Sequence, residues 1–464
     1  TTYQSYACMT PTNRRAVVDA GQVTFDLTPN IAGDASYTLD FTVFGDEVLF
    51  VADSADSDAN LTVRSTGDAG TFNPSGHLII ANAAGSSGGL TVDNVTFDGA
   101  TLTVGNAGSG MLTIQNGSTL ELADSLATGF ENTIANLSGS TGSLVIDNAY
   151  LISTASVRFR TIIVGNAGDG TLDVQDTATV SNTGATIGNS PGSTGAVTID
   201  NADWTSVNEQ ILVGNEGEGS LTLQKSASLT TFQGVLGGLS GGTGTATVDA
   251  STWTTVGSLE LASSTLDPAN SSRTGTLTIQ NGATVTIGDI GFVGNNGSVG
   301  SSGAVIVDNA SLVNDNRILV ANLGDGSMTI QNSATVSGRV FQVGVGGSTT
   351  GIVTVDDSQL TNSSVLVAGV NGNGTLEIQN GATVSNTNGL IAAGAASSGT
   401  VTVDNATWNN SNLLIVGGAG NGTMHIVNGA AVTSAAGFIG DEDVGGNTGS
   451  GLVTGGNASW TANG

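Results

Sequence analysis

The sequence predicts an all-β fold, a right-handed parallel β-helix (β-solenoid) of about fifteen coils, and three observations support this. The first is a motif, represented by residues 112–117 (LTIQNG), that recurs about every 24 residues from Leu90 onward. The second is that two forms of the motif alternate, one with Gln and one with Asp before an Asn. The third is that each copy contains three short apolar runs separated by Gly and Asn, which is the layout of one solenoid coil.

Each run has the pattern of a short strand. Leu112 and Ile114 alternate with polar Thr113 and Gln115, a second apolar run such as residues 102–106 (LTVGN) precedes the motif, and a third run follows the Asn. A single coil buries too little apolar surface to offset the entropy lost on ordering its backbone. The coils must therefore stack, with strands about 4.8 Å apart, and fifteen such rises predict a rod about 70 Å long.

The alternation of Asp and Gln predicts that equivalent residues lie in register. An unbroken Asp column would place carboxylates about 4.8 Å apart, a repulsion of about 3.5 kcal/mol per pair at an effective dielectric constant of about 20. An intervening Gln doubles the spacing, and its amide can donate to carboxylates on both sides. The Gln forms are Gln115, Gln175, Gln224, Gln280, Gln331 and Gln379, and the Asp forms are Asp93, Asp147, Asp200, Asp249, Asp308, Asp356 and Asp404.

The residue after Asp or Gln is usually Asn, and it predicts a turn ladder. Asn tolerates the left-handed backbone conformation better than most residues and can hydrogen-bond a stacked neighbour. Eleven of the fifteen copies carry it: Asn94, Asn116, Asn148, Asn201, Asn281, Asn309, Asn332, Asn380, Asn405, Asn428 and Asn457.

The repeats resemble those of a known class of bacterial proteins. Residues 108–120 and 420–432 are close to the form Gly-x-Gly-x-Leu-Thr-Ile-x-Asn-Gly-x-x-Val, and residues 401–408 read VTVDNATW. These segments look like the repeat of type V secretion passengers (autotransporters) and PEP-CTERM-associated surface proteins, and the similarity covers about residues 78–464. The resemblance implies an exported bacterial β-helix, found outside the cell or on its surface.

Composition excludes several classes of function. The formal net charge is −29, and the nine Lys and Arg residues are scattered, so a nucleic-acid-binding surface is not expected. Cys8 is the only cysteine, so it is either inert or pairs with another chain. The sequence contains no apolar run long enough for a membrane-spanning helix. The absence of an apolar leader after Thr1 fits a mature exported product.

Two regions are predicted. Residues 1–75 hold three of the five prolines and three of the four tyrosines, and we interpret them as an N-terminal cap with an extended arm and atypical strands. Residues 76–464 form the solenoid. No comparable cap is recognised at the C-terminus, so we expect the last strand edge to be able to receive another subunit, giving a head-to-tail filament.

An aromatic column is one candidate binding surface. The four tryptophans, assigned to the third place after the Asn column, would form an outward stripe that stacks on sugar rings, or would pack inside the solenoid. They are Trp204, Trp253, Trp408 and Trp460, and Phe97, Tyr150, Leu312 and Leu360 are assigned to the same place.

Metal and catalytic sites are poorly supported. Related Gly-rich turns hold the Ca²⁺ candidates Asp169, Glu216, Glu218 and Asp325, although Ca²⁺ needs six to eight converging oxygens. The two histidines, His77 and His425, are far apart in the sequence, so no His-based catalytic site is predicted. Longer connections at residues 121–131 and 263–273 are the best candidates for partner-binding loops.

The sequence therefore predicts a non-enzymatic, cofactor-free structural protein of the cell surface or extracellular matrix that polymerises with itself. An adhesin that binds glycans or cell surfaces is the first alternative. A polysaccharide lyase or hydrolase is the second.

Overall fold

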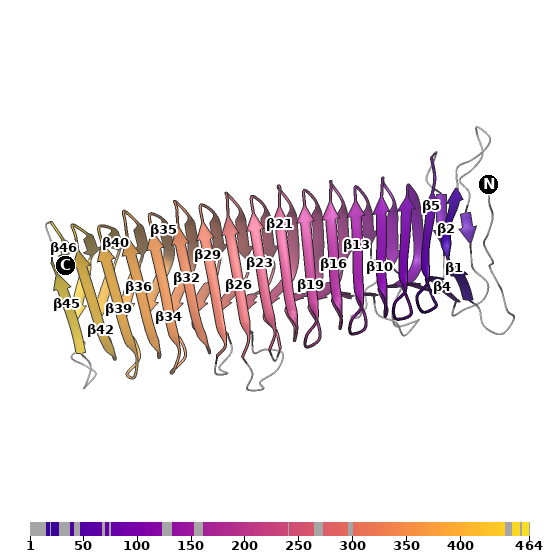
Figure 1. Ribbon diagram of the computed structural model, residues 1–464. Helices are drawn as coiled ribbons and strands as arrows, with labels where there is room; N and C mark the ends of the chain where they lie inside the picture. Colours follow the sequence, from indigo (N-terminus) through magenta and orange to yellow (C-terminus); the bar gives the residue numbers. More distant parts are fainter. Residues whose placement is uncertain are drawn as a thin grey trace. The chain divides into compact units, whose positions relative to one another are not determined.

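The protein is described by a computed structural model that covers residues 15–18, 20–26, 38–40, 47–66, 70–73, 76–122, 132–152, 161–239, 241–263, 272–295, 300–440, 448–454 and 457–463. The chain forms two compact units, residues 1–232 (unit 1) and 233–464 (unit 2). In both units the described residues form strands and no helix, and the strands stack in parallel as successive coils of a β-solenoid (Figure 1). This confirms the predicted all-β, parallel solenoid fold. The described part of the chain offers no helix able to cross a membrane.

Each coil contributes to three parallel ladders. Ladder A holds the motif strand, ladder B holds the strand after the Asn turn, and ladder C holds the strand that leads into the next motif. In unit 1, ladder A comprises β2 (Gly21–Asp26), β5 (Asp58–Arg64), β8 (Ser87–Asp93), β10 (Ser109–Gln115), β13 (Thr141–Asp147), β16 (Asp169–Gln175), β19 (Thr194–Asp200) and β21 (Glu218–Gln224). Ladder B comprises β3 (Thr38–Asp40), β6 (Gly70–Asn73), β11 (Thr119–Leu122), β14 (Tyr150–Ile152) and β17 (Thr179–Asn182). Ladder C comprises β1 (Arg15–Val18), β4 (Glu47–Val51), β7 (Gly76–Ile80), β12 (Asn132–Ile134), β15 (Thr161–Val164) and β18 (Gly184–Ile187), while β9 (Val95–Val104) and β20 (Asp203–Val213) bend from ladder B into ladder C.

Unit 2 repeats this arrangement. Its ladder A comprises β23 (Thr243–Asp249), β26 (Thr274–Gln280), β29 (Ser302–Asp308), β32 (Asp325–Gln331), β34 (Thr350–Asp356), β36 (Asn373–Gln379), β39 (Ser398–Asp404), β42 (Asn421–Val427) and β45 (Thr448–Val453). Ladder B comprises β24 (Thr252–Thr255), β27 (Thr284–Ile287), β30 (Ser311–Asn314), β37 (Thr383–Asn386), β40 (Thr407–Asn410), β43 (Ala431–Ser434) and β46 (Ser459–Ala462). Ladder C comprises β25 (Leu259–Leu261), β28 (Ile290–Val293), β31 (Arg317–Val320), β38 (Asn388–Ile391), β41 (Leu413–Val416) and β44 (Ala436–Ile439). The strands β33 (Thr335–Val343) and β35 (Gln359–Ala368) bend from ladder B into ladder C, and residues 234–236 of β22 (Ser228–Leu236) pair with β25.

The motif copies stack residue over residue, as predicted. Gln115 of β10 is paired with Asp93 of β8 on one side and with Asp147 of β13 on the other. Alternate residues of each motif strand point inward, so that Leu112 and Ile114 are fully buried. The core of each unit is therefore a column of aliphatic side chains, covered on all sides by the three ladders.

The Asn column adopts the predicted left-handed turn. All fifteen residues at this place, from Asn94 to Asn457, have φ between 46° and 63°. The set includes the exceptions Asp176, Lys225, Ala250 and Asp357, so the conformation is imposed by the coil and not by Asn alone. This left-handed residue turns the chain from ladder A into ladder B.

The described part of residues 1–75 contributes strands to the same ladders. Strand β2 pairs with β5, and β5 pairs in register with β8, the first motif strand. Residues 1–14 lie outside the described residues, so neither the predicted arm nor Cys8 can be placed.

Candidate functional site

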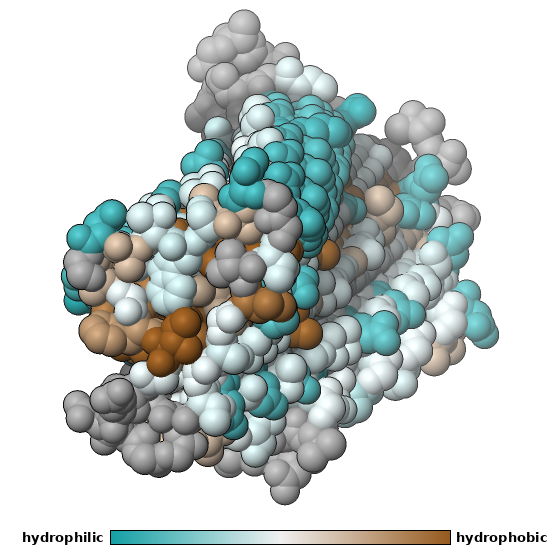
Figure 2. Space-filling view, turned by 90° about the vertical axis from the view of Figure 1, so that its left-hand side faces the viewer, coloured by the Kyte–Doolittle hydropathy of each residue, from teal (hydrophilic) through white to brown (hydrophobic). Residues whose placement is uncertain are grey.

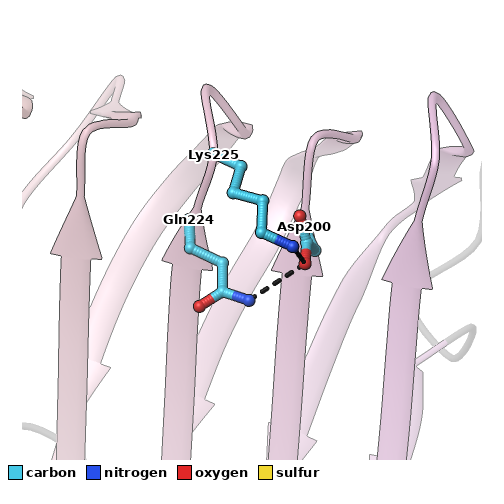
Figure 3. Close-up of polar contacts among 3 residues, drawn as sticks. All are labelled: Asp200, Gln224 and Lys225. Atoms are coloured by element: carbon cyan, nitrogen blue, oxygen red, sulfur yellow. Dashed lines mark hydrogen bonds and ion pairs between the residues drawn. The ribbon is translucent and has the colours of Figure 1, made fainter.

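The Asp column is tied to the next coil by side-chain hydrogen bonds. In unit 1, Gln224 Nε2 donates to Asp200 Oδ2 at 3.0 Å, and Lys225 Nζ lies 2.6 Å from the same oxygen (Figure 3). The Lys225 side chain is 71% exposed and that of Asp200 is 20% exposed. The hydrogen bond from Lys225 lowers the pKa of Asp200, Gln224 adds to this effect, and Asp200 in turn raises the pKa of Lys225.

Unit 2 contains the same arrangement with Asn in place of Lys. Asp308 accepts hydrogen bonds from Gln331 at 3.0 Å and from Asn332 at 2.7 Å, one to each carboxylate oxygen. Asp249 likewise accepts one hydrogen bond on each carboxylate oxygen, from Gln280 and Asn281. Asp356 does the same with Gln379 and Asn380. We call this arrangement the carboxylate clamp.

The carboxylate clamp corrects one prediction about Gln. In the described residues the Gln-to-Asp side-chain bonds run only to the preceding coil, because each Gln directs its single Nε2 toward that Asp, not to both neighbours.

The other predicted ladder residues occupy the same two columns. Asn116 donates to Asp93 at 2.7 Å, Asn94 donates to the backbone oxygen of Ser65, and Asn148 accepts from Thr177. Asp147 and Gln175 are paired across β13 and β16.

A second polar column, not recognised in the sequence as a ladder, runs through unit 1. It comprises Asn82, Asn106, Asn136, Asn166, Asn189 and Asn215, which are partly buried at the turn from ladder C to ladder A. Each Nδ2 from Asn106 onward donates to the Oδ1 of the preceding Asn at 2.7–2.9 Å, and Asn82 donates to Asp53 at 2.8 Å. All amide dipoles therefore point the same way, toward the carboxylate. The signal was present in the sequence as the Gly-Asn pairs at Asn106, Asn166, Asn189 and Asn215.

The tryptophans do not form an exposed glycan-binding stripe. Trp204, Trp253 and Trp408 are at most 1% exposed and pack in the core, and Trp460 is partly exposed. The reason is the strand period of two, which points the second residue of each ladder B strand inward. The indole nitrogens bond polar groups of the preceding coil, as Trp204 does to Asn182 at 2.9 Å and Trp408 to Asn386 at 2.7 Å.

Tyr150 was also assigned to the wrong column. Leu151 is paired with Val180 and, through it, with Trp204, whereas Tyr150 is 47% exposed on the outward side.

Trp253 and Trp408 each lie beside a glycine on ladder C. A Cβ atom added to Gly234 would lie 2.7 Å from the Trp253 ring, and one added to Gly389 would lie 2.8 Å from the Trp408 ring. The indole therefore occupies the space that a larger ladder C residue fills in other coils.

The proposed calcium ligands do not converge. Asp169 is the first residue of β16 and Glu218 is the first residue of β21, and strand β19 lies between these two strands. Asp169 accepts a hydrogen bond from Thr194 at 2.6 Å. Asp325 lies in unit 2 and accepts from the backbone of Thr350. Across the described ranges no group of three or more His, Cys, Asp or Glu is arranged to hold a metal ion.

The histidines occupy different environments. His77 is 3% exposed, and its ring contacts the hydroxyls of Thr101 and Thr103. Burial lowers the pKa of His77 to about 4, although a hydrogen bond involving the backbone of Thr101 opposes the shift. His77 is therefore uncharged at neutral pH, and His425 is half-buried on ladder A.

One buried ionic cluster adjoins a predicted loop. Glu260 is 3% exposed and accepts hydrogen bonds from Gln233, Ser263 and Asn295, while Arg273, 1% exposed, donates to the backbone oxygen of Ser263. These contacts join the two ends of the connection at residues 264–271. That connection and the one at 123–131, both predicted to bind partners, lie outside the described residues.

No family model, no curated protein and no solved structure matches this chain.

Proposed function

We propose that the protein is a non-enzymatic structural element of the cell surface or the extracellular matrix. The observation that carries the proposal is the use of its polar columns. The carboxylates of the Asp column and the amides of the unit 1 Asn column are bonded to neighbouring coils, and the same bonds recur from coil to coil. An active site needs polar groups free to bind a substrate, whereas these groups hold coils together.

Location outside the cell is supported by the acidic composition and by the resemblance of the repeats to exported bacterial proteins. A net charge of −29 opposes non-specific association between proteins. Surface labelling of intact producing cells, followed by fractionation, tests this part. The protein should be labelled and recovered from the envelope or medium, and exclusive recovery from the cytosol would refute it.

The hypothesis of self-association concerns two apolar side chains of β44 in unit 2. Phe438 is 55% exposed and Ile439 is 49% exposed, whereas Ile391 and Val416, which occupy the place of Ile439 in earlier coils, are fully buried. Figure 2 shows apolar residues in brown on this face. A further coil stacked there, from this chain or from a second copy, would cover them.

Sedimentation velocity over a range of concentrations, combined with electron microscopy, tests self-association. We expect higher-order species for the wild type and their loss in Ile439→Asp. Ile352→Asp is the matched control, because Ile352 is 45% exposed on the side of ladder A. Monomers at all concentrations, or equal effects of the two variants, would contradict the head-to-tail contact.

The absence of enzymatic activity is tested separately. Incubation with neutral and acidic polysaccharides should release no reducing or unsaturated ends. Sustained release that depends on the protein would favour the alternative of a polysaccharide lyase or hydrolase.

A further inference from the structure

An uncharged groove crosses four successive coils of unit 2 at the bend from ladder B to ladder C. It has a volume of about 320 Å³ and is lined by amide and hydroxyl side chains from β35, β37, β40 and β43, including those of Asn362, Asn386, Asn410 and Thr433. This volume lies at the lower end of the range for small-molecule sites, about 300–1,000 Å³. All the lining residues belong to unit 2 and lie within the described ranges.

One amide in this groove has no hydrogen-bond partner. Asn362 is 2% exposed, and neither its Nδ2 nor its Oδ1 finds a partner. The equivalent Asn386 accepts from Trp408 and donates to Asn410, at 2.7 Å each. In the coil before Asn362 its paired residue is Gly338, which has no side chain. In the coil after it, Val384 holds the place that Trp408 holds relative to Asn386, so no indole donates to Asn362. A buried amide left unpaired costs about 1–3 kcal/mol, so a ligand that pairs with it gains affinity.

The chemistry of the groove selects an uncharged ligand. Residues 359–366, 383–390, 407–414 and 431–438 contain no charged side chain, in a chain whose net charge is −29. An anion would be repelled by the overall field, and a divalent cation would find no carboxylate here. Paired donors and acceptors, supplied by Asn, Ser and Thr, match the hydroxyl groups of sugars.

Two apolar residues follow the groove residues in the chain. Val365 and Leu413 lie on ladder C, three residues after Asn362 and two residues after Ser411, and both are half-exposed. A pyranose ring presents hydroxyls at its edge and C–H groups on its faces, so a ligand of this class suits both the polar lining and these apolar neighbours. Because the lining repeats across adjacent strands about 4.8 Å apart, an extended chain fits better than a single sugar.

We propose that this groove binds a neutral oligosaccharide, with Asn362 as a specific hydrogen-bonding residue. The site does not depend on the structural role proposed above, since a fibre-forming protein and a monomer would present the same groove. An uncharged Ser/Thr-rich peptide is the competing occupant. It fits less well, since its backbone would need unpaired strand edges, which the continuous ladders at this bend do not offer.

Saturation-transfer NMR and calorimetry with neutral oligosaccharides, such as cello-, xylo- and manno-oligosaccharides, test the proposal on the full chain. We expect saturable binding that is abolished by Ser385→Trp, which fills the groove. The matched control is Ser181→Trp in unit 1, because both serines precede an Asn bonded to a buried Trp. Asn362→Leu should weaken binding about tenfold through the loss of its hydrogen bonds.

A second variant guards against misfolding. Ser411→Trp also fills the groove but replaces an exposed side chain at its rim, and circular dichroism should show both Trp variants folded. The proposal is overturned if no oligosaccharide binds saturably, if water alone occupies the groove, if the peptide binds and the sugars do not, or if Ser181→Trp and the groove variants behave alike.

Discussion

The second place of a ladder C strand holds a small residue where the next coil holds a buried tryptophan: Ala185 before Trp204, Gly234 before Trp253 and Gly389 before Trp408. At Gly234 an added Cβ would lie 2.7 Å from Leu259 Cδ1 and 2.7 Å from Trp253 Cζ2, so Gly234→Ala overpacks the core. Overpacking costs about 1–3 kcal/mol, and the reduced entropy of the unfolded chain returns about 0.4–1 kcal/mol. We therefore expect a net loss of about 1–2 kcal/mol in the free energy of unfolding.

Gly291 provides the matched control. It occupies the same column as Gly234, but the next coil presents Leu312 there, and a cavity of about 10 Å³ is lined by both residues. The nearest atom to an added Cβ is Ile287 Cδ1 at 3.2 Å, a contact that needs only a small adjustment. Gly291→Ala should therefore stabilise the protein by about 0.4–1 kcal/mol, the opposite sign from Gly234→Ala.

Urea denaturation measures both changes, and hydrogen exchange in β22, β25 and β28 locates them, because stacked repeats can open locally. In a Trp253→Leu background the cost of Gly234→Ala should fall by about 1 kcal/mol, since the two contacts with the indole are gone and only that with Leu259 Cδ1 remains. The reasoning fails if the two Gly→Ala variants change stability with the same sign, or if Trp253→Leu leaves the cost unchanged.

Three further predictions concern the polar columns and His77. Lys225→Met should raise the pKa of Asp200 toward its ordinary value of 3.8, which a carbon-detected NMR titration measures. The lowered pKa stabilises the folded protein above pH 3.8, and this stabilisation, which is lost as the pH falls through the folded-state pKa, should shrink in the variant. An unchanged titration would show that Lys225 is not the cause of the lowered pKa. The wild type should lose about 3 kcal/mol of stability as the pH falls from 6.5 to about 4, because His77 gains a proton only on unfolding. Urea midpoints measured over this pH range should show the loss in His425→Gln but not in His77→Gln. Asn136→Ala should cost about 2–3 kcal/mol in thermal or urea unfolding, because Asn106 Oδ1 loses its donor and Asn166 Nδ2 loses its side-chain acceptor. The control is the exposed Asn412→Ala, which removes one amide bond to Asn388 and should cost about 1 kcal/mol or less. Equal costs would mean that the buried amide column contributes no more than an exposed amide pair.

Much of the fold could be predicted because repetition makes each column visible. The alternation of Asp and Gln predicts register through simple electrostatics, and Asp93, Gln115 and Asp147 do lie side by side. The Asn residues predict left-handed turns because few other residues tolerate that conformation without strain. Both inferences use only a residue and its counterpart in the next copy.

The inward or outward direction of a side chain was harder to predict. The Trp column lies just beyond a left-handed residue, and the turn geometry sets which way the following strand faces. Without that geometry the period of the strand does not decide whether Trp204 is exposed or buried, and only Leu312 and Leu360 in the same column favoured the interior, where Trp204 lies. The buried amides of unit 1 were missed for a related reason, since Asn106 reads as a turn residue until its partner Asn82 is known.

The groove at residues 359–438 has no signature in any single copy. It depends on Gly338 beside Asn362 in the preceding coil, on Val384 in place of a tryptophan in the following coil, and on the passage of β35 from ladder B to ladder C. A site assembled from irregularities in three consecutive coils becomes visible only in three dimensions.

The directionality of the carboxylate clamp constrains how such a gene can change length. Each Asp receives its amides from the coil that follows, so removing a single coil from unit 2 would place two carboxylates, or two glutamines, in contact. Removing or duplicating an adjacent pair leaves every donor facing an acceptor. Unequal recombination is therefore tolerated in steps of two coils, and natural length variants, or designed ones, should differ by an even number.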